Sequence, residues 1–335
     1  MDWERRYLNA YGHRFDMGLT AKQYQRRLEA TVNYFIPLGE LEEDYLTLTL
    51  SYEGKDLDIN DLNAAQLQGV VSGTTRAHQG TLAISKHHSR QLFEDIPLRE
   101  VLSLEYFIEH YNLFNILPGG FESKFAQVAP QLIPVYKADY QLLMPIINWS
   151  YEQADNPAYI THGQQLQLSL RGSKDGLGSN ASFWQTRLDG KLIRSLWEQG
   201  RVIIRGNLGY TWDNVVNFGG FEANLLPESI LFKTGGANSV RGYSFESLNY
   251  NGLGARNLLV GSLEYEHRIL AQWGLAAFYD AGNVFNDFSH ITLARGAGAG
   301  LRWYSPVGPI KLDAASALSK DGNPWRVDFN FGAEF

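Results

Sequence analysis

The sequence predicts an all-β protein, an antiparallel up-and-down β-barrel of about fifteen strands that crosses a membrane. Three observations support this fold class. Apolar and polar residues alternate with a period of two in a segment about every 15 to 20 residues. Short and long connections alternate along the chain, as they do at the two ends of an outer-membrane barrel. No run approaches the ~18 apolar residues of a spanning helix, whereas a barrel strand needs apolar residues only at alternate positions.

Each predicted strand places apolar residues on one face and polar residues on the other. The clearest example is Tyr45–Tyr52, in which three leucines and a tyrosine alternate with threonine and serine. The predicted strands are Trp3–Leu8, His13–Ala21, Arg26–Phe35, Tyr45–Tyr52, Gly80–His88, Leu98–Tyr111, Leu142–Tyr151, Gln164–Gly172, Phe183–Leu196, Arg201–Trp212, Asn257–Ile269, Trp273–Val284, Ala294–Tyr304, Pro309–Leu318 and Trp325–Phe335.

The connections between these strands differ in length at the two ends. Three long loops are expected at Lys55–Thr75, Asn112–Ala138 and Asn214–Ala255, and turns as short as Glu198–Gly200 lie between them. A soluble β-sandwich would instead mix its loop lengths. Charged residues share one face in several strands, as in Lys311 and Asp313, and they would line either a wet lumen or a solvent-exposed outer face.

Composition and charge narrow the possible partners. The chain has 335 residues, a net charge of −7 and no cysteine. No cluster of lysine and arginine indicates nucleic acid, and the absence of cysteine suits an oxidising envelope. The sequence opens directly in patterned residues at Met1-Asp2-Trp3, without a signal peptide. An outer-membrane protein needs one, so we expect this chain to be part of a longer gene product.

The sequence gives no indication of an enzyme, a metal or a cofactor. His87 and His88 are the adjacent pair among eight scattered histidines, and neighbours in a strand face opposite ways. No serine stands in a nucleophile elbow. Gly296-Ala297-Gly298-Ala299-Gly300 lacks the spacing and the following helix of a nucleotide-binding loop. We expect these alternating glycines to leave space in the lumen for a loop tip.

The most distinctive stretch runs from Gly235 to Asp280. Because side chains alternate across a strand, Glu264 and Asp280, on two neighbouring predicted strands, face the same side. Arg241 precedes them in a glycine-rich loop, within Val240-Arg241-Gly242-Tyr243. A guanidinium can pair with two carboxylates, and a charge held away from water needs such partners. The loop is therefore either a plug inside the barrel or an ordinary surface loop.

The C-terminal stretch is a second candidate site. It places Trp325, Val327, Phe329, Phe331 and Phe335 on one face and ends on an aromatic residue. Such a face is a good anchor at a membrane interface. Any amphipathic last strand would share this pattern.

The Val240–Tyr243 tetrad and the strands Ser262–Tyr265 and Phe278–Gly282 resemble the bacterial surface antigen superfamily of outer-membrane assembly factors. Within it, they are most similar to the translocation and assembly module branch. The resemblance covers essentially the whole chain and is most specific from Gly235 onward. It implies one barrel domain, residues 1–335, of the 16-strand type, with the family's first strand, its POTRA domains and its signal peptide absent from this chain.

The resemblance also implies roles for both candidate sites. The loop 214–255 would fold into the lumen, where Arg241 would pair with Glu264 and Asp280 on the barrel wall. The aromatic pattern that ends at Phe335 would be a sorting signal on the strand at the barrel seam.

The implied function is assembly, without bond chemistry, in the outer membrane of a Gram-negative bacterium. Such a barrel would help to insert autotransporters and other β-barrel clients through a lateral seam between its first and last strands. Its expected partners are the lipid bilayer, client proteins, an inner-membrane partner of the TamB type and, through the open seam edge, a second copy of itself. The alternatives are the barrel of a patatin-like or two-partner secretion transporter, and a passive porin.

Overall fold

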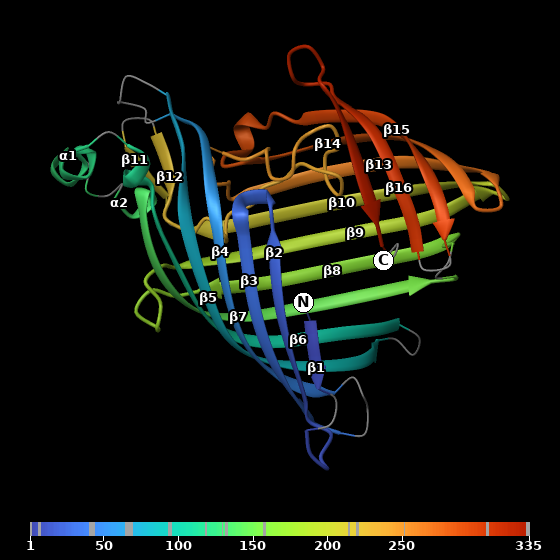
Figure 1. Ribbon diagram of the computed structural model, residues 1–335, viewed down its shortest axis with the longest axis horizontal. Helices are drawn as coiled ribbons and strands as arrows, with labels where there is room; N and C mark the ends of the chain where they lie inside the picture. The colour runs from blue at the N-terminus through green and yellow to red at the C-terminus, as the bar shows by residue number, and fades with distance from the viewer. Residues whose placement is uncertain are drawn as a thin grey trace.

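Fifteen strands of the chain form a single antiparallel sheet in which each strand pairs with its neighbours in sequence. The computed structural model describes residues 2–5, 8–39, 44–63, 70–92, 96–117, 119–128, 130, 133–156, 159–213, 215–218, 221–250, 252–305 and 308–332. The strands tilt and the sheet curls around on itself, as in a barrel (Figure 1). In this described part of the chain the sheet order begins at β1 and ends at β17, so these strands are its two edges. The predicted all-β fold of about fifteen antiparallel strands is confirmed.

The strands of this sheet are β1 (Asp2–Arg5), β2 (Arg14–Lys22), β3 (Arg27–Pro37), β4 (Tyr45–Asn63), β5 (Val70–Leu92), β6 (Ile96–Asn112), β7 (Lys137–Ala154), β8 (His162–Ser173), β9 (Phe183–Trp197), β10 (Gly200–Asp213), β13 (Asn257–Leu270), β14 (Trp273–Phe285), β15 (Ala294–Ser305), β16 (Gly308–Ala317) and β17 (Trp325–Phe331). A separate hairpin, β11 (Val215–Phe218) and β12 (Phe221–Asn224), opens the long connection between β10 and β13.

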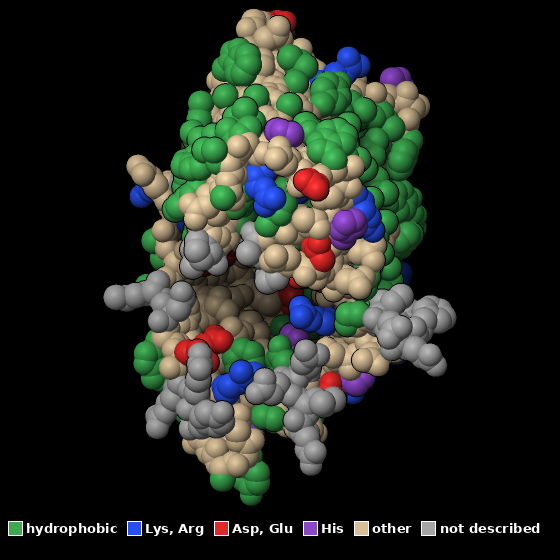
Figure 2. Space-filling view, turned by 90° about the vertical axis from the view of Figure 1, so that its right-hand side faces the viewer, with side chains coloured by type: hydrophobic (Ala, Val, Ile, Leu, Met, Phe, Trp, Pro, Cys, Tyr) green, Lys and Arg blue, Asp and Glu red, His purple; other side chains and the backbone are tan. Residues whose placement is uncertain are grey.

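Strand alternation divides the sheet into an apolar outer face and a mixed inner face. In β14, Leu275 and Tyr279 are exposed, whereas Ala276, Phe278 and Asp280 are buried. This is the alternation of a lipid-facing barrel strand. Viewed from one end of the strands, hydrophobic side chains lie around the periphery of the molecule and a hollow opens at its centre (Figure 2). In the described residues no helix is both long enough and apolar enough to span a membrane.

One of the three predicted long loops is wrong. The strands β4 and β5 extend through most of Lys55–Thr75, and only residues 64–69 of that range lie outside the described structure. The apolar alternation fails there because polar residues pair across the ladder. Asp56 lies opposite Arg76 and accepts a hydrogen bond from it at 2.8 Å. Polar pairs of this kind support the ladder beside Leu57, which is buried.

The other two predicted long connections exist and contain short elements of their own. The connection after β6 carries a 3-10 helix (Leu113–Ile116) and two α-helices, α1 (Phe121–Val128) and α2 (Ile133–Tyr136), which the sequence pattern did not indicate. Phe114 and Tyr136 from this insert belong to a buried cluster that also includes Leu226 and Leu231 of the long β10–β13 connection. The helical insert and the base of that connection therefore pack together at one end of the barrel.

An added side chain at the alternating glycines of β15 would collide with neighbouring segments of the chain. A Cβ at Gly298 would collide with the carbonyl oxygen of Ala314 and lie 2.6 Å from Phe278 Cζ. We expect Gly298→Ala to lower the free energy of unfolding by about 1–3 kcal/mol through overpacking. Gly261→Ala on β13 is the matched control, because nothing lies within 4 Å of its added Cβ. Urea unfolding of both variants in lipid checks this, and equal stability of the two would contradict it.

Candidate functional site: a buried charge network at the loop tip

The connection between β10 and β13 folds back on itself and carries Arg241 at its tip. Two isolated backbone bridges hold its arms together. Beyond them, the Gly236 N–H donates to the Val240 carbonyl at 3.2 Å, which closes a turn just before the arginine. Gly242 follows with a φ of +90°, a conformation that is free of strain for glycine. The glycine-rich sequence thus makes the tight reversal that presents Arg241.

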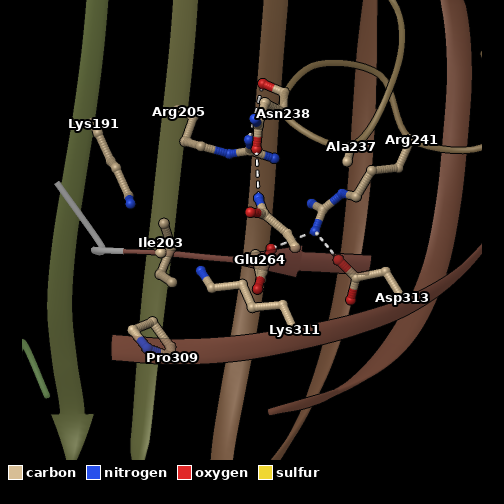
Figure 3. A pocket seen from close by; sticks show the side chains of 12 residues that line it. Lys191, Ile203, Arg205, Ala237, Asn238, Arg241, Glu264, Pro309, Lys311 and Asp313 are labelled. Atoms are coloured by element: carbon tan, nitrogen blue, oxygen red, sulfur yellow. Dashed lines mark hydrogen bonds and ion pairs between the residues drawn. The ribbon is translucent and has the colours of Figure 1, made fainter. Parts of the chain in front are cut away.

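Arg241 binds carboxylates from three strands of the wall, β13, β14 and β16. Its Nε and Nη2 atoms donate to the two oxygens of Asp280 at 2.8 and 2.9 Å, and its backbone N–H donates to Asp280 Oδ2 at 3.0 Å. Its Nη1 atom donates to Glu264 at 2.6 Å and reaches Asp313 at 3.4 Å (Figure 3). The structure therefore brings together Arg241, Glu264 and Asp280, and it adds Asp313.

This contact is shielded from solvent. Arg241 is 2% exposed and Asp280 is 0% exposed. The guanidinium carbon of Arg241 lies 3.4 Å from the centroid of the Phe278 ring, within range of a cation–π interaction. Bidentate, charge-assisted hydrogen bonds of this type are among the strongest in proteins. The loop tip is therefore fixed to the wall by contacts that solvent competes for only weakly.

A second arginine extends the network along the wall. Arg302 donates to Glu264 at 2.6 Å, to Glu266 at 2.9 Å and to Asp313 at 2.6 Å. Glu266 in turn accepts from Arg201 Nε at 2.7 Å. Arg201, Arg302 and Glu266 are fully buried. The carboxylates that bind the loop are thus themselves held in place by the strands.

Arg205 adds a further guanidinium group to the cluster. Its Nη2 atom donates to Ser262 at 3.0 Å, its Nη1 atom donates to the Asn238 carbonyl of the loop at 3.1 Å, and the guanidinium lies 3.9 Å from Asp280. Figure 3 shows Arg205 beside a cavity of about 100 Å³ at the loop tip. Four guanidinium groups therefore face four carboxylates, which offsets the cost of burying them. They are Arg201, Arg205, Arg241 and Arg302, and Glu264, Glu266, Asp280 and Asp313.

The sequence indicated Glu264 and Asp280 but missed Arg201 and Arg302 as members of the cluster. Arg201 lies directly opposite Glu266 in the β10–β13 register. That pairing was a possible signal, because both are charged and both fall on the inner face. To recognise this pair, one must know the register between β10 and β13, which the long loop separates in sequence. The period-two pattern of each strand does not give that register.

The β15 glycines make room for the tip. The Cβ that any other residue would place at Gly296 would collide with the backbone carbonyl of Arg241. At Gly300 it would collide with the Asp313 carboxylate and lie 2.5 Å from Arg302 Nη1. The space that the alternating glycines leave is thus occupied by the loop backbone and by the charge network.

The remaining predicted residues fall in two places. Val240 and Tyr243 are buried in a cluster with Leu258 and Val260 of β13, on either side of Arg241 in sequence. Gly242 lies against the backbone at Ser316. The last strand turns its apolar residues outward, and its exposed side chains are Trp325, Val327, Phe329 and Phe331. Phe335 lies outside the described residues.

The charged groups of this site are arranged for binding one another. Among the residues that the structure describes, no group of three or more His, Asp or Glu side chains is placed to hold a metal ion. Every carboxylate oxygen of Glu264, Asp280 and Glu266 accepts a hydrogen bond. The arrangement therefore holds a loop in position.

Removing the arginine tests how the loop is held. We expect Arg241→Ala to leave the strands intact and to cost roughly 3–5 kcal/mol of stability, because Asp280 would remain buried without its partner. Chymotrypsin should then cleave the loop near Tyr243 faster than in the wild type. Arg295→Ala, which removes an exposed side chain from β15, is the control. Unchanged cleavage and unfolding in Arg241→Ala would contradict this account.

The chain was compared with known proteins. Residues 9–335 match the Omp85 superfamily domain. The fold is similar to a BamA crystal structure from Haemophilus ducreyi lacking POTRA domains 1–3, with a TM-score of 0.67, 18% identity, and coverage of 98% of this chain and 65% of that one. It is also similar to CdiB from Escherichia coli, with a TM-score of 0.61, 13% identity, and coverage of 98% and 57%.

CdiB from Acinetobacter baumannii gives a TM-score of 0.57 at 14% identity, with coverage of 98% of this chain and 55% of that one. The chain thus spans about 55 to 65% of the length of these structures. At such low identities the likeness shows the fold, whereas the domain match extends over nearly all of the chain. The chain therefore belongs to the Omp85 superfamily, whose barrels lie in the Gram-negative outer membrane.

Proposed function

We propose that this chain is a TamA-like assembly factor, which helps to insert autotransporters and other β-barrel clients through a lateral seam between its first and last strands. The observation that carries the proposal is the edge strand β17. In the described part of the chain, β17 pairs with β16 over seven residues and with no strand on its other side. An unpaired edge is a template for strand addition.

The position of this edge suits a client that arrives within the membrane. Trp325, Val327 and Phe329 are exposed on the outer face of β17, so the edge lies beside the apolar outer surface. Unpaired backbone groups are costly in hydrocarbon, because no water is available to satisfy them. A client strand that pairs with β17 would remove that cost, and this supplies a driving force for insertion.

The docked loop supports a route through the seam. The network around Arg241 holds the β10–β13 connection against the wall, and the base of this connection packs on the helical insert. A client that passed through the lumen would have to break these buried contacts. A client that joined the edge could leave them intact.

A transporter of the two-partner secretion type is the second candidate. The likeness to two CdiB barrels favours it, and so does a cavity of about 570 Å³ between the loop and the wall. Movement of the loop would widen that cavity, because Glu228 and Lys233 of the loop line it. A passive porin fits less well, because the loop is held by buried ion pairs. A patatin-like passenger would be a property of an upstream domain.

Two further partners follow from the assembly proposal. An inner-membrane protein of the TamB type would deliver or shield clients on the periplasmic side. A second copy of the chain could pair with the same β17 edge as a client does, which would give a homodimer. The second copy would compete with a client for the β17 edge, so the crosslinking experiment below also bears on the homodimer.

Cysteine crosslinking tests the route. The chain has no cysteine, so a single introduced thiol is unambiguous. We expect Val327→Cys on β17 to form a disulfide with a cysteine in the last strand of a β-barrel client during insertion into vesicles. Leu263→Cys on β13 is the matched control, since its side chain is similarly exposed on the outer face (54% against 66%). Crosslinks should form at position 327 far more than at position 263.

The same assay distinguishes the second candidate. Asn148→Cys places the thiol on the wall of the 570 Å³ cavity. Crosslinks of a passenger to that position, with none at position 327, would contradict the seam route and support a transporter. Equal crosslinking at positions 263 and 327 would show that contact with β17 is nonspecific.

A further inference from the structure

The long loop is docked at a second place, far along the sheet from Arg241. Its first half contacts the wall formed by β4–β9, whereas the tip contacts β13–β16. The two docking points lie on different walls because β6 and β13 are separated by four strands in the sheet order. The loop therefore spans the lumen between them.

Glu109 of β6 is the centre of this second contact. Its carboxylate accepts the backbone N–H of Glu228 at 2.8 Å and that of Ser229 at 3.4 Å. Gln79 of β5 donates to the same carboxylate at 2.8 Å. Glu109 is 1% exposed. A buried carboxylate that receives two loop amides fixes the loop backbone itself, whatever side chains the loop carries.

Two lysines complete the contact. Lys55 Nζ of β4 lies 2.8 Å from the Glu228 carboxylate, and Lys233 of the loop pairs with the other oxygen of the same group. Glu228 is 2% exposed. Glu53 also lies 3.7 Å from Lys55, so each ammonium group has a carboxylate partner, which offsets the cost of desolvating it. The Ile230 carbonyl extends the contact by accepting from Gln185 at 2.8 Å.

We propose that Glu109 is a positioning residue in a second latch for the loop. This latch, made of Glu109, Glu228, Lys55 and Lys233, holds the first half of the loop on the β4–β6 wall independently of Arg241. The loop leaves the lumen only when both docking points release. The proposal concerns only the state in which the loop is docked in the lumen. It therefore holds whether the barrel is an assembly factor or a transporter.

The cavity beside the latch gives the proposal a specific readout. The lining of the 570 Å³ cavity carries five cationic and three acidic side chains, and both Lys55 and Glu228 are part of it. Loosening the latch should open a path for ions along this surface. Because cations are in excess on it, the current should be carried mainly by anions. The cationic residues are Arg27, Lys55, Arg171, Arg187 and Lys233, and the acidic ones are Glu53, Glu228 and Glu246.

The test is the conductance of the whole chain in a planar lipid bilayer, with no client present. We expect Glu109→Gln to raise the open fraction, which is the fraction of time that a single barrel conducts, roughly 10- to 100-fold. This is the change expected when a buried group loses its charge-assisted hydrogen bonds. The reversal potential in a salt gradient should show anion selectivity. Glu105→Gln is the matched control, because it makes the same change on the inner face of β6, where burial is partial.

Combining variants tests whether the two latches are independent. The effects of Glu109→Gln and Arg241→Ala on the open fraction should multiply, as for sites that do not share partners. If Glu109→Gln does not fold, Lys55→Gln carries the same expectation, because Lys55 pairs with the carboxylate of Glu228, the loop residue whose backbone N–H donates to Glu109. Silent currents in a folded latch variant, or cation-selective currents, would overturn the proposal. Client crosslinking at position 327 would be unaffected by that result, so the two proposals fail separately.

Discussion

The structure depends on one constraint: charges that leave water must find partners of opposite sign. Around Arg241, four guanidinium groups and four carboxylates meet on the inner face of β10 and β13–β16. A buried pair adds little stability over an apolar contact, yet removing one member is costly. Such a cluster therefore specifies a single position of the loop. The β15 glycines and the outward apolar residues of the strands are arranged around that position.

Much of the fold was predictable from the sequence, because a barrel wall forces a period of two on every strand. The fifteen strands, the antiparallel order and the outer-membrane location are confirmed. The partnership of Arg241 with Glu264 and Asp280 followed from strand parity and from a family motif, and the structure places these three side chains in contact. Their role in function stays a proposal.

The features that the sequence did not predict depend on which strands pair with one another and on the path of the long loop. The length of β4 and β5 was missed because Asp56 and Arg76 pair across the ladder where no apolar pattern exists. Arg302 was missed because its partners come from β13 and β16, and Glu109 because its partners are loop amides more than a hundred residues away. Contacts of this kind are set by register and by loop path, which local patterns do not encode.

Hydrogen–deuterium exchange of the native barrel in lipid tests the central claim most directly. The claim is that the loop tip is fixed by the buried network, in which the Arg241 N–H donates to Asp280. The account predicts that amides of residues 235–243 exchange as slowly as those of β13. Exchange as fast as in the exposed turn at residues 174–178 would contradict it, because the tip would then spend much of its time away from the wall.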